Sequence, residues 1–361
     1  MAYLIYSHFH QYFTPLNVLQ YISFRTAGAL LTALFLTFLV TLPIIKRLKQ
    51  FKVHQKIRAD GPETHFPKAD TPTMGGIIIF ICMIISIILW ARLDNRFVVI
   101  ALIGTVYLGL IGFIDDYLKH VKCDPKGLRP RYKLFAQFVL AIALAVYLYL
   151  YPSSQEYQAF VNIPYLKSVF INLGVFYILF VIFTIVGASN AVNLTDGLDG
   201  LAVGAIIFCS LTYMVLAYVV GHIKFSSYLR IVPIIGSGEL VVFLAALVGA
   251  GLGFLWYNTY PAEIFMGDTG SLFLGGAIGI IAVIIKQEIL LIVAGGIFVI
   301  EALSVILQVG FFRFKKKRIF KMAPLHHHFE LLGWSEPKIV IRFWILGIIL
   351  ALVALSALKI R

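Results

Sequence analysis

Charged residues are scarce in this sequence. Of its 361 residues only 13% are Asp, Glu, Lys or Arg, whereas 60% are hydrophobic and the mean hydropathy is +0.93. Soluble globular domains carry about 25% charged residues. The composition therefore excludes that class and indicates a protein embedded in a membrane.

Cysteine is also nearly absent. The three cysteines, Cys82, Cys123 and Cys209, include no close pair, and Cys82 and Cys209 fall inside apolar runs. This spacing offers neither a disulfide framework nor a zinc site. The N-terminus lacks a basic segment followed by a cleavage site, so we expect no removable signal peptide.

Long apolar runs are what the sequence has in abundance. Between Arg25 and Lys46 there are 20 residues without an acidic or basic side chain, and between Asp70 and Arg92 there are 21. A helix of about 20 such residues crosses a bilayer. The runs predict an all-α integral membrane protein, a single polytopic domain over residues 1–361 with ten transmembrane helices. An interfacial segment over 1–24 precedes spans at about 26–45, 72–91, 97–115, 134–152, 169–188, 200–220, 240–257, 269–285, 289–310 and 339–358.

Lysine and arginine are distributed unevenly between the loops. The loops after spans one, three and nine hold seven, six and seven of them, so 20 lie on one side, against nine on the other. The positive-inside rule predicts that the basic side is cytoplasmic and that both termini are periplasmic. This distribution accounts for most of the net charge of +13 without nucleic acid, which we do not expect as a partner.

The polar motifs share that side. Because random polar turns would be spread over both faces, their convergence predicts an active site at the cytoplasmic face. They come from five different loops: Lys68 with TPTMGG (71–76), Asp115-Asp116, NAVNLTDGLDG (190–200), Asn258 with MGDTGS (266–271), and MAPLHHHFE (322–330).

The motif NAVNLTDGLDG contains two carboxylates three residues apart. On a helical turn Asp196 and Asp199 point to one side. Gly197 and Gly200 have no side chain and allow close approach of a ligand or another backbone. Neighbouring carboxylates at a membrane boundary repel one another unless a cation or polar ligand offsets their charge. The alternative is a polar turn that caps two helices.

Two further acidic sites indicate a cation. Asp115 and Asp116 are adjacent at the mouth of an apolar helix, and hard oxygen ligands combined with phosphate substrates favour Mg²⁺. The alternative is an acidic helix end offset by Lys119 and Lys122. Asp268 opens a predicted helix, where it can cap the first turn beside backbone amides that suit a phosphate.

The three consecutive histidines do not suit one metal. On a helix their side chains would point about 100° apart. We expect His326, His327 and His328 in a loop, where they can donate hydrogen bonds to phosphate or sugar oxygens. Glu301 lies within an apolar run and is either functional or paired with a neighbour.

Together these motifs resemble the phospho-N-acetylmuramoyl-pentapeptide transferases, a family of polyprenyl-phosphate N-acetylhexosamine-1-phosphate transferases. The Asp-Asp and NLTDGLDG elements fit the whole superfamily, whereas TPTMGG and the histidine segment fit the muramoyl-pentapeptide branch. The resemblance implies transfer of phospho-MurNAc-pentapeptide from UDP-MurNAc-pentapeptide to undecaprenyl phosphate, which gives lipid I and UMP. It also implies a multi-pass protein of the bacterial inner (cytoplasmic) membrane. A homodimer and contacts with other cell-wall enzymes remain open.

The resemblance further implies residue roles. Asp115, Asp116 and Asp268 would be catalytic, with Asp268 as the ligand of Mg²⁺. One departure is Asp70, where the family pattern has glycine, and it puts the detailed geometry of Lys68 in question. The implied substrate-binding residues are Lys68, Thr73, Lys119, Asn190, Asp196, Asp199, Asn258, His326, His327 and His328.

Three alternative functions are weighed against this one. A secondary transporter would place its binding elements near mid-membrane in paired halves, but here the clusters lie at one face and no half repeats. A prenyltransferase would need DDxxD, and the fifth position is Lys119. A related N-acetylglucosamine-phosphate transferase lacks the histidine segment and is the nearest alternative. Direct attack and a covalent aspartyl intermediate both remain open mechanisms.

Overall fold

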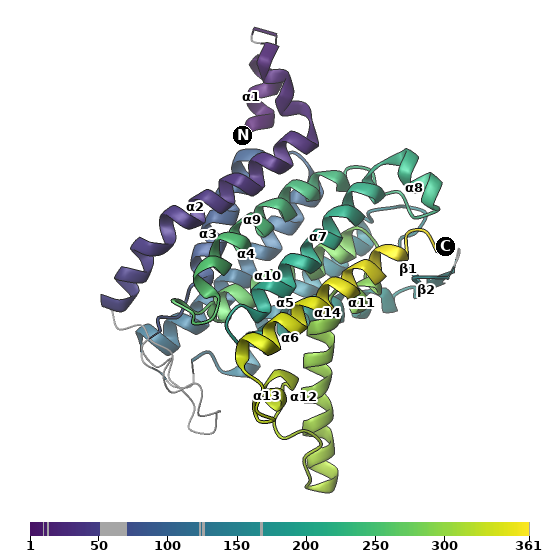
Figure 1. The fold of residues 1–361 in the computed structure, drawn as a ribbon. Helices are drawn as coiled ribbons and strands as arrows, with labels where there is room; N and C mark the ends of the chain where they lie inside the picture. The colour runs from purple at the N-terminus through teal and green to yellow at the C-terminus, as the bar shows by residue number, and fades with distance from the viewer. Residues whose placement is uncertain are drawn as a thin grey trace.

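The computed structural model describes residues 1–9, 11–12, 14–50, 71–122, 124, 127–166 and 169–360. Over these ranges the chain is a helical bundle with one small hairpin, in which β1 (Phe160–Asn162) pairs antiparallel with β2 (Phe170–Asn172) (Figure 1). The predicted membrane class is thereby confirmed as a helical protein with nine helices long and apolar enough to cross a bilayer in this part of the chain. They are α2 (Ile22–Gln50), α4 (Arg96–Asp116), α5 (Pro130–Leu150), α6 (Phe176–Thr195), α7 (Leu201–Gly221), α9 (Leu240–Asn258), α10 (Gly267–Ile284), α12 (Gly296–Lys315) and α14 (Glu336–Ser356).

The second predicted span, at 72–91, is a shorter apolar helix, α3 (Gly76–Trp90). It begins four residues later than expected because the chain before it is extended and paired. The amide of Phe265 donates to the carbonyl of Pro72 (2.9 Å), and the amide of Gly75 donates back to Phe265 (2.8 Å). Met74 takes a left-handed conformation (φ 72°) in this segment. The TPTMGG motif is therefore a structured lead-in to α3.

Helix α6 is displaced along the sequence from the predicted span at 169–188. Strand β2 occupies the beginning of that range, and the helix runs from Phe176 to Thr195. The apolar residues of the hairpin resemble a helix in composition, which explains the error. As a result Asn190 to Thr195 form the last turns of a helix and not a loop.

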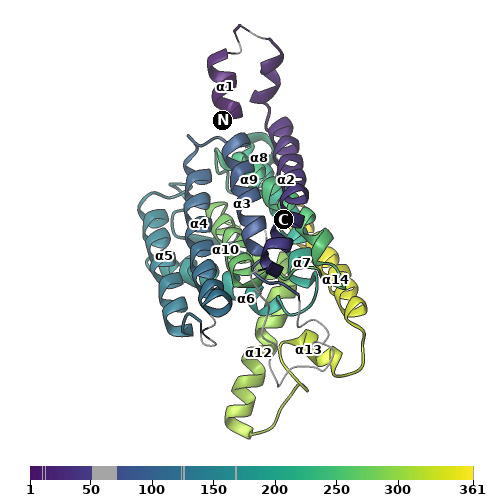
Figure 2. The same cartoon turned by 90° about the vertical axis from the view of Figure 1, so that its left-hand side faces the viewer.

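The predicted span at 289–310 is broken in two. A short helix, α11 (Leu290–Ala294), ends just before Gly295, and α12 starts at Gly296. Paired glycines commonly interrupt a helix. Figure 1 and Figure 2 show α12 leaving the bundle at an angle to its neighbours. In the most apolar 18-residue stretch of α12, only 22% of the residues are buried inside the protein, so most of this helix faces outward.

The remaining elements are short. The segment predicted as interfacial forms α1 (Ala2–Phe9) and the 3₁₀ helix η1 (Thr14–Gln20). A π-helical turn, η3 (Tyr117–Val121), extends α4, and α8 (Ile223–Leu229) and η4 (Ser237–Glu239) lie between α7 and α9. The histidine motif forms helix α13 (Leu325–Glu330), so the expectation of a loop there is wrong.

Helices α9 and α10 form the centre of the bundle: in their most apolar 18-residue stretches, 83% and 89% of the residues are buried. Small residues allow their neighbours to approach closely. A side chain on Gly249 would collide with the backbone of Leu30 in α2, and one on Gly112 in α4 would collide with the backbone of Asp268. The second contact brings the end of α4 against the start of α10, and this junction positions the polar residues described next.

Candidate active site

Asp268, in the first turn of α10, is the centre of a charged cluster. Its Oδ2 lies 2.5 Å from Nζ of Lys119 and 3.1 Å from Nζ of Lys133. Its Oδ1 accepts a hydrogen bond from Nδ2 of Asn193 (2.6 Å), which also donates to Oγ of Ser271 (2.7 Å). The cluster therefore joins η3, α5 and α6 to the start of α10.

Asp115 binds the same two lysines. Its Oδ2 lies 2.9 Å from Nζ of Lys119 and 3.2 Å from Nζ of Lys133, and its Oδ1 accepts from the amide of Leu128 (2.9 Å). The carboxylates of Asp115 and Asp268 thus share two ammonium groups. Alternating charges of this kind offset the cost of withdrawing each group from water.

Asp116 faces a different partner from its neighbour Asp115. Its Oδ1 accepts from the amide of Asp268 (3.1 Å), and its Oδ2 accepts from the amide (2.8 Å) and the hydroxyl (2.6 Å) of Thr269. These are free amides at the N-terminus of α10, so Asp116 caps that helix from outside. The two adjacent aspartates, both predicted to be catalytic, therefore contact different parts of the protein.

The turn between α6 and α7 lies beside this cluster. Burial, with the nearby charges of Asp268 and Asp116, raises the pKa of Asp196 to about 8. Asp199 accepts a hydrogen bond from the amide of Ala262 (3.1 Å) and is itself buried. The acidic turn is thus close enough to Asp268 for the charges to interact.

Asn258 holds the same turn from the end of α9. Its Oδ1 accepts from the amide of Gly200 (3.1 Å), and its Nδ2 donates to the carbonyl of Ile264 (2.8 Å).

Asn190, in contrast, is not brought into the cluster. Its amide donates to Oε1 of Gln137 (2.5 Å) and to the carbonyl of Val186 (2.8 Å), so it joins α6 to α5.

His326 connects α13 to the acidic turn. Its side chain is buried, and Nδ1 lies 3.2 Å from Oε2 of Glu301 in α12. The amide of His326 also donates to Oε1 of Glu301 (3.2 Å). A side chain on Gly197 would collide with Nε2 of His326. Glu301 is therefore paired with a neighbour, one of the two readings that the sequence left open.

The other two histidines point elsewhere. Nδ1 of His327 lies 2.6 Å from Oε2 of Glu330, and Nδ1 of His328 accepts from the amide of Lys321 (3.1 Å). The three rings thus meet three different partners, as successive positions on a helix require. Of the three rings, that of His326 is the one seen against Gly197 of the acidic turn in the described part of the chain.

Several residues fall outside the sequence prediction or outside the described chain. Lys133 and Asn193 belong to the cluster but are not among the predicted site residues. Asn193 could have been predicted, because it lies within NAVNLTDGLDG. Nothing in the sequence around Lys133, apart from its charge, indicates a role. Lys68, Asp70 and Cys123 lie outside the described residues, and Thr73 is buried in the extended segment before α3.

An apolar cavity of about 310 Å³ runs along α6 between α10, α11 and α12. Ala191 and Val192 line one end, directly before Asn193 of the cluster, and Glu288 lines the other. The aromatic rings of Phe183 and Phe298 form part of its wall. An apolar chain in this cavity would have one end beside the charged cluster.

Comparison with known proteins identifies two matching family models and many similar chains. The model of glycosyl transferase family 4 matches residues 97–286, and signature 1 of the phospho-N-acetylmuramoyl-pentapeptide-transferases matches residues 68–80. The chain is 53% identical to the phospho-N-acetylmuramoyl-pentapeptide-transferase of Endomicrobium trichonymphae over 361 residues, which is 100% of each chain. Identity to the protein of the same name from Thermodesulfovibrio yellowstonii is 54% over 362 residues, again 100% of each chain. For Pelobacter propionicus it is 54% over 345 residues, 96% of each.

The capping contact of Asp116 predicts a structural role. Asp116→Asn keeps one acceptor oxygen but directs an amide donor at the N–H groups of α10. We expect a loss of about 1–3 kcal/mol of stability, the cost of leaving buried polar groups unpaired. Thermal unfolding in detergent measures this loss, with Asp94→Asn as control because Asp94 is an exposed ion-pair residue. Equal unfolding temperatures for the two variants would rule out the capping role.

Proposed function

Because this chain belongs to the phospho-N-acetylmuramoyl-pentapeptide transferase family, we propose that it transfers phospho-MurNAc-pentapeptide from UDP-MurNAc-pentapeptide to undecaprenyl phosphate, releasing UMP and lipid I. The chain is a multi-pass membrane enzyme of peptidoglycan synthesis. Identity of 53% over the full length of a relative carries this assignment. The match to TPTMGG separates the muramoyl-pentapeptide branch from related N-acetylglucosamine-phosphate transferases.

The lysines of the cluster supply the main catalytic effect. A pyrophosphate bond is broken and another is formed, so the barrier lies mainly in bringing anions together. Fixed positive charges at the site of developing charge stabilise such a transition state. Lys119 and Lys133 are held in place by Asp115 and Asp268, and a phosphate entering the cluster would meet both ammonium groups.

We propose direct attack by the lipid phosphate. A phosphate monoester has a second pKa of roughly 6, so it is mostly a dianion at neutral pH and needs no general base. Asp115 then acts by orienting the lysines, and Asp116 acts by fixing the first turn of α10. The covalent aspartyl mechanism remains the alternative.

The donor set around Asp268 fits Mg²⁺. Asp115 and Asp268 direct hard carboxylate oxygens at a region where positive charge is already favourable, as the two bound ammonium groups indicate. When bound, Mg²⁺ would neutralise phosphate charge. In the described part of the chain no three acidic, histidine or cysteine side chains form a metal-binding group, so phosphate oxygens and water would complete the coordination.

The two substrates are proposed to approach from different sides. The apolar cavity along α6 suits the polyprenyl chain of the acceptor, because it ends beside Asn193. The donor would lie over the acidic turn, with Asp196 and His326 nearest to it. Asp199 and Asn258 use their side chains to hold this turn to the loop before α10, so they shape the donor site.

We also propose that the cluster lies at the cytoplasmic face and that both termini are periplasmic. The basic loops and the polar motifs occur at the same ends of the helices, as the positive-inside rule favours.

Variants in which the native cysteines are replaced and one new cysteine is introduced test this orientation. An impermeant thiol reagent should label Ser227→Cys in α8 on intact spheroplasts, and Ser335→Cys before α14 only after permeabilisation. The reverse labelling pattern would contradict it.

The activity is tested by UMP release from the purified protein in detergent with Mg²⁺ and undecaprenyl phosphate. We expect release with UDP-MurNAc-pentapeptide and little with UDP-GlcNAc.

Asp268→Asn keeps the size of the side chain but removes the charge that Mg²⁺ and the lysines require. Turnover should fall by a factor of ~10² or more, the scale of one lost transition-state contact.

Two controls accompany this assay. Asp268→Glu keeps the charge and should recover part of the activity at raised Mg²⁺. The unfolding temperature of each variant separates a lost charge from a lost fold. If Asp268→Asn turns over normally at low Mg²⁺, Asp268 does not hold the metal.

The contact between His326 and the acidic turn gives a second activity prediction. Gly197→Ala places a methyl group against Nε2 of His326 and displaces the buried ring from Glu301. We expect catalytic efficiency to fall about tenfold or more, equivalent to about 1.4 kcal/mol. Gly310→Ala in α12 is the matched control, because a methyl group there meets nothing within 4 Å. Equal rates for both variants would show that the contact is not needed.

A further inference from the structure

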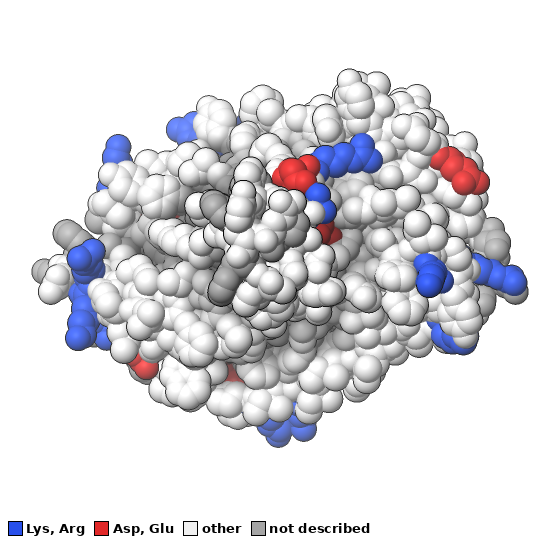
Figure 3. All heavy atoms as spheres, turned by 90° about the horizontal axis from the view of Figure 1, so that it is seen from above, with Lys and Arg blue, Asp and Glu red and all other residues white. Residues whose placement is uncertain are grey.

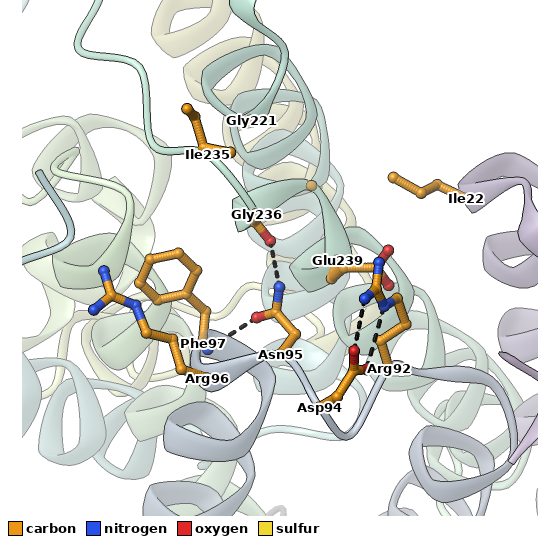
Figure 4. Close-up of a pocket in the computed structure, with 11 residues that line it drawn as sticks. Ile22, Arg92, Asp94, Asn95, Arg96, Phe97, Gly221, Ile235, Gly236 and Glu239 are labelled. Atoms are coloured by element: carbon orange, nitrogen blue, oxygen red, sulfur yellow. Dashed lines mark hydrogen bonds and ion pairs between the residues drawn. The ribbon is translucent and has the colours of Figure 1, made fainter. Parts of the chain in front are cut away.

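A second cavity, of about 540 Å³, lies at the opposite end of α4 from the catalytic carboxylates. Figure 4 shows its lining, which comes from the start of α2, the loop between α3 and α4, the end of α7 and the segment before α9. Helix α4 has 21 residues, and at about 1.5 Å per residue it separates the two sites by roughly 30 Å. This distance is close to the thickness of the hydrocarbon core of a bilayer. The cavity therefore lies at the level of the other membrane surface.

Two ion pairs border this cavity: Arg92, Asp94 and Glu239 line it, and the buried Arg25 binds Glu239 from behind. The guanidinium of Arg25 binds the carboxylate of Glu239 through two bonds of 2.6 and 2.8 Å, and Arg92 binds Asp94 at 2.6 and 3.2 Å. The ring of Tyr3 lies 4.1 Å from Cζ of Arg92 and 5.3 Å from Cζ of Arg25. These contacts fix both guanidinium groups in position.

Arg96 adds a positive charge that pairs with no carboxylate of the described residues. It donates to the carbonyl of Pro152 (3.0 Å) and stacks on Phe97 (4.6 Å), and it forms no ion pair with any residue that the structure describes. Figure 4 shows its guanidinium on the other side of Asn95 from Arg92. The cavity lining itself holds two arginines and two carboxylates. Because Arg25 neutralises Glu239 from behind and Arg92 pairs with Asp94, Arg96 is left as one excess positive charge.

Two further features increase the demand for an anion. Asn95 caps α4 by accepting from the amides of Phe97 (2.9 Å) and Val98 (3.3 Å), and α9 with η4 begins on the adjoining wall, so the positive ends of two helix dipoles meet the cavity. Arg25 is 1% exposed, and within the described residues its Nε donates to nothing. The positive groups here are not fully satisfied by the protein.

The rim of the cavity is apolar. Ile22 and Ile235 line it, and Ile235 is 72% exposed. Figure 3 shows that the molecule seen from above is mostly uncharged, with basic and acidic side chains adjoining near its centre. A polar floor with one excess positive charge beneath an apolar rim matches a phospholipid, whose phosphodiester carries one negative charge next to hydrocarbon.

We propose that this cavity binds the head group of an anionic phospholipid from the leaflet opposite the active site. The phosphodiester lies between Arg92 and Arg96, and the glycerol and acyl chains lie along Ile235. A zwitterionic lipid is bound less well, because its ammonium group restores the excess positive charge. The inference does not depend on the reaction that the enzyme catalyses.

The test uses purified full-length protein in detergent, with short-chain phosphatidylglycerol as probe and native mass spectrometry as readout. The wild type should retain phosphatidylglycerol at least tenfold more tightly than phosphatidylethanolamine. Arg92→Gln combined with Arg96→Gln should weaken phosphatidylglycerol binding about tenfold or more, since charge-assisted contacts to phosphate are lost. Lys224→Gln is the matched control, because Lys224 is an exposed cation of α8 that does not line the cavity.

Three outcomes would overturn the proposal. Equal retention of the two lipids would contradict the charge argument. Displacement of the lipid by millimolar inorganic phosphate would identify a site for soluble anions. Unchanged binding in the double variant would place the lipid elsewhere. Because neither arginine contacts the catalytic cluster, UMP release by the double variant should stay within twofold of wild type, which shows that it is folded.

Discussion

Two lysines and two aspartates form the contact on which the catalytic end of the bundle depends. Lys119 and Lys133 each bind both Asp115 and Asp268 at 2.5 to 3.2 Å. Any one of these charges alone would be costly at the end of an apolar helix. As a set they neutralise one another, and they connect α4, α5 and α10 at one point. In the proposed reaction the same lysines would receive phosphate charge, so the contact that stabilises this junction would also serve the chemistry.

The adjacent aspartates divide two tasks between them. Successive residues on a helix point about 100° apart, so Asp115 faces the lysines whereas Asp116 faces the backbone of α10. Asp116 positions the amides of Asp268 and Thr269 and thereby the Asp268 carboxylate. Glu301 acts similarly on His326, which presses on Gly197 in the acidic turn. Carboxylates that do not face the lysines therefore orient the groups that border the proposed substrate site.

The sequence predicted the class and the family, but less of the local geometry. Apolar runs locate the spans because a helix must be apolar over the thickness of the hydrocarbon core. The polar motifs converge because charged side chains are stable at the end of the helices, where they meet water. Composition does not distinguish the apolar hairpin strand at Phe170 from a helix, nor does it show that Gly295 divides one run into two helices. The histidines form a helix because tertiary contacts with Glu301 and Gly197 outweigh the local pattern. Lys133 reaches the cluster from α5, and this contact cannot be predicted from the spacing of residues along the chain.

Helix α4 connects the two proposed sites, and its dipole opposes the charges at both ends. Arg96 stands at its N-terminus and Asp115 with Asp116 at its C-terminus, where partial charges of the same sign repel them. At the catalytic end the two lysines and the N-terminus of α10 offset this repulsion. At the other end Asn95 satisfies the first amides, but Arg96 has only a carbonyl and a ring as partners. A ligand of opposite charge would therefore stabilise each end further, the proposed Mg²⁺ at the carboxylates and the proposed phospholipid at the arginines.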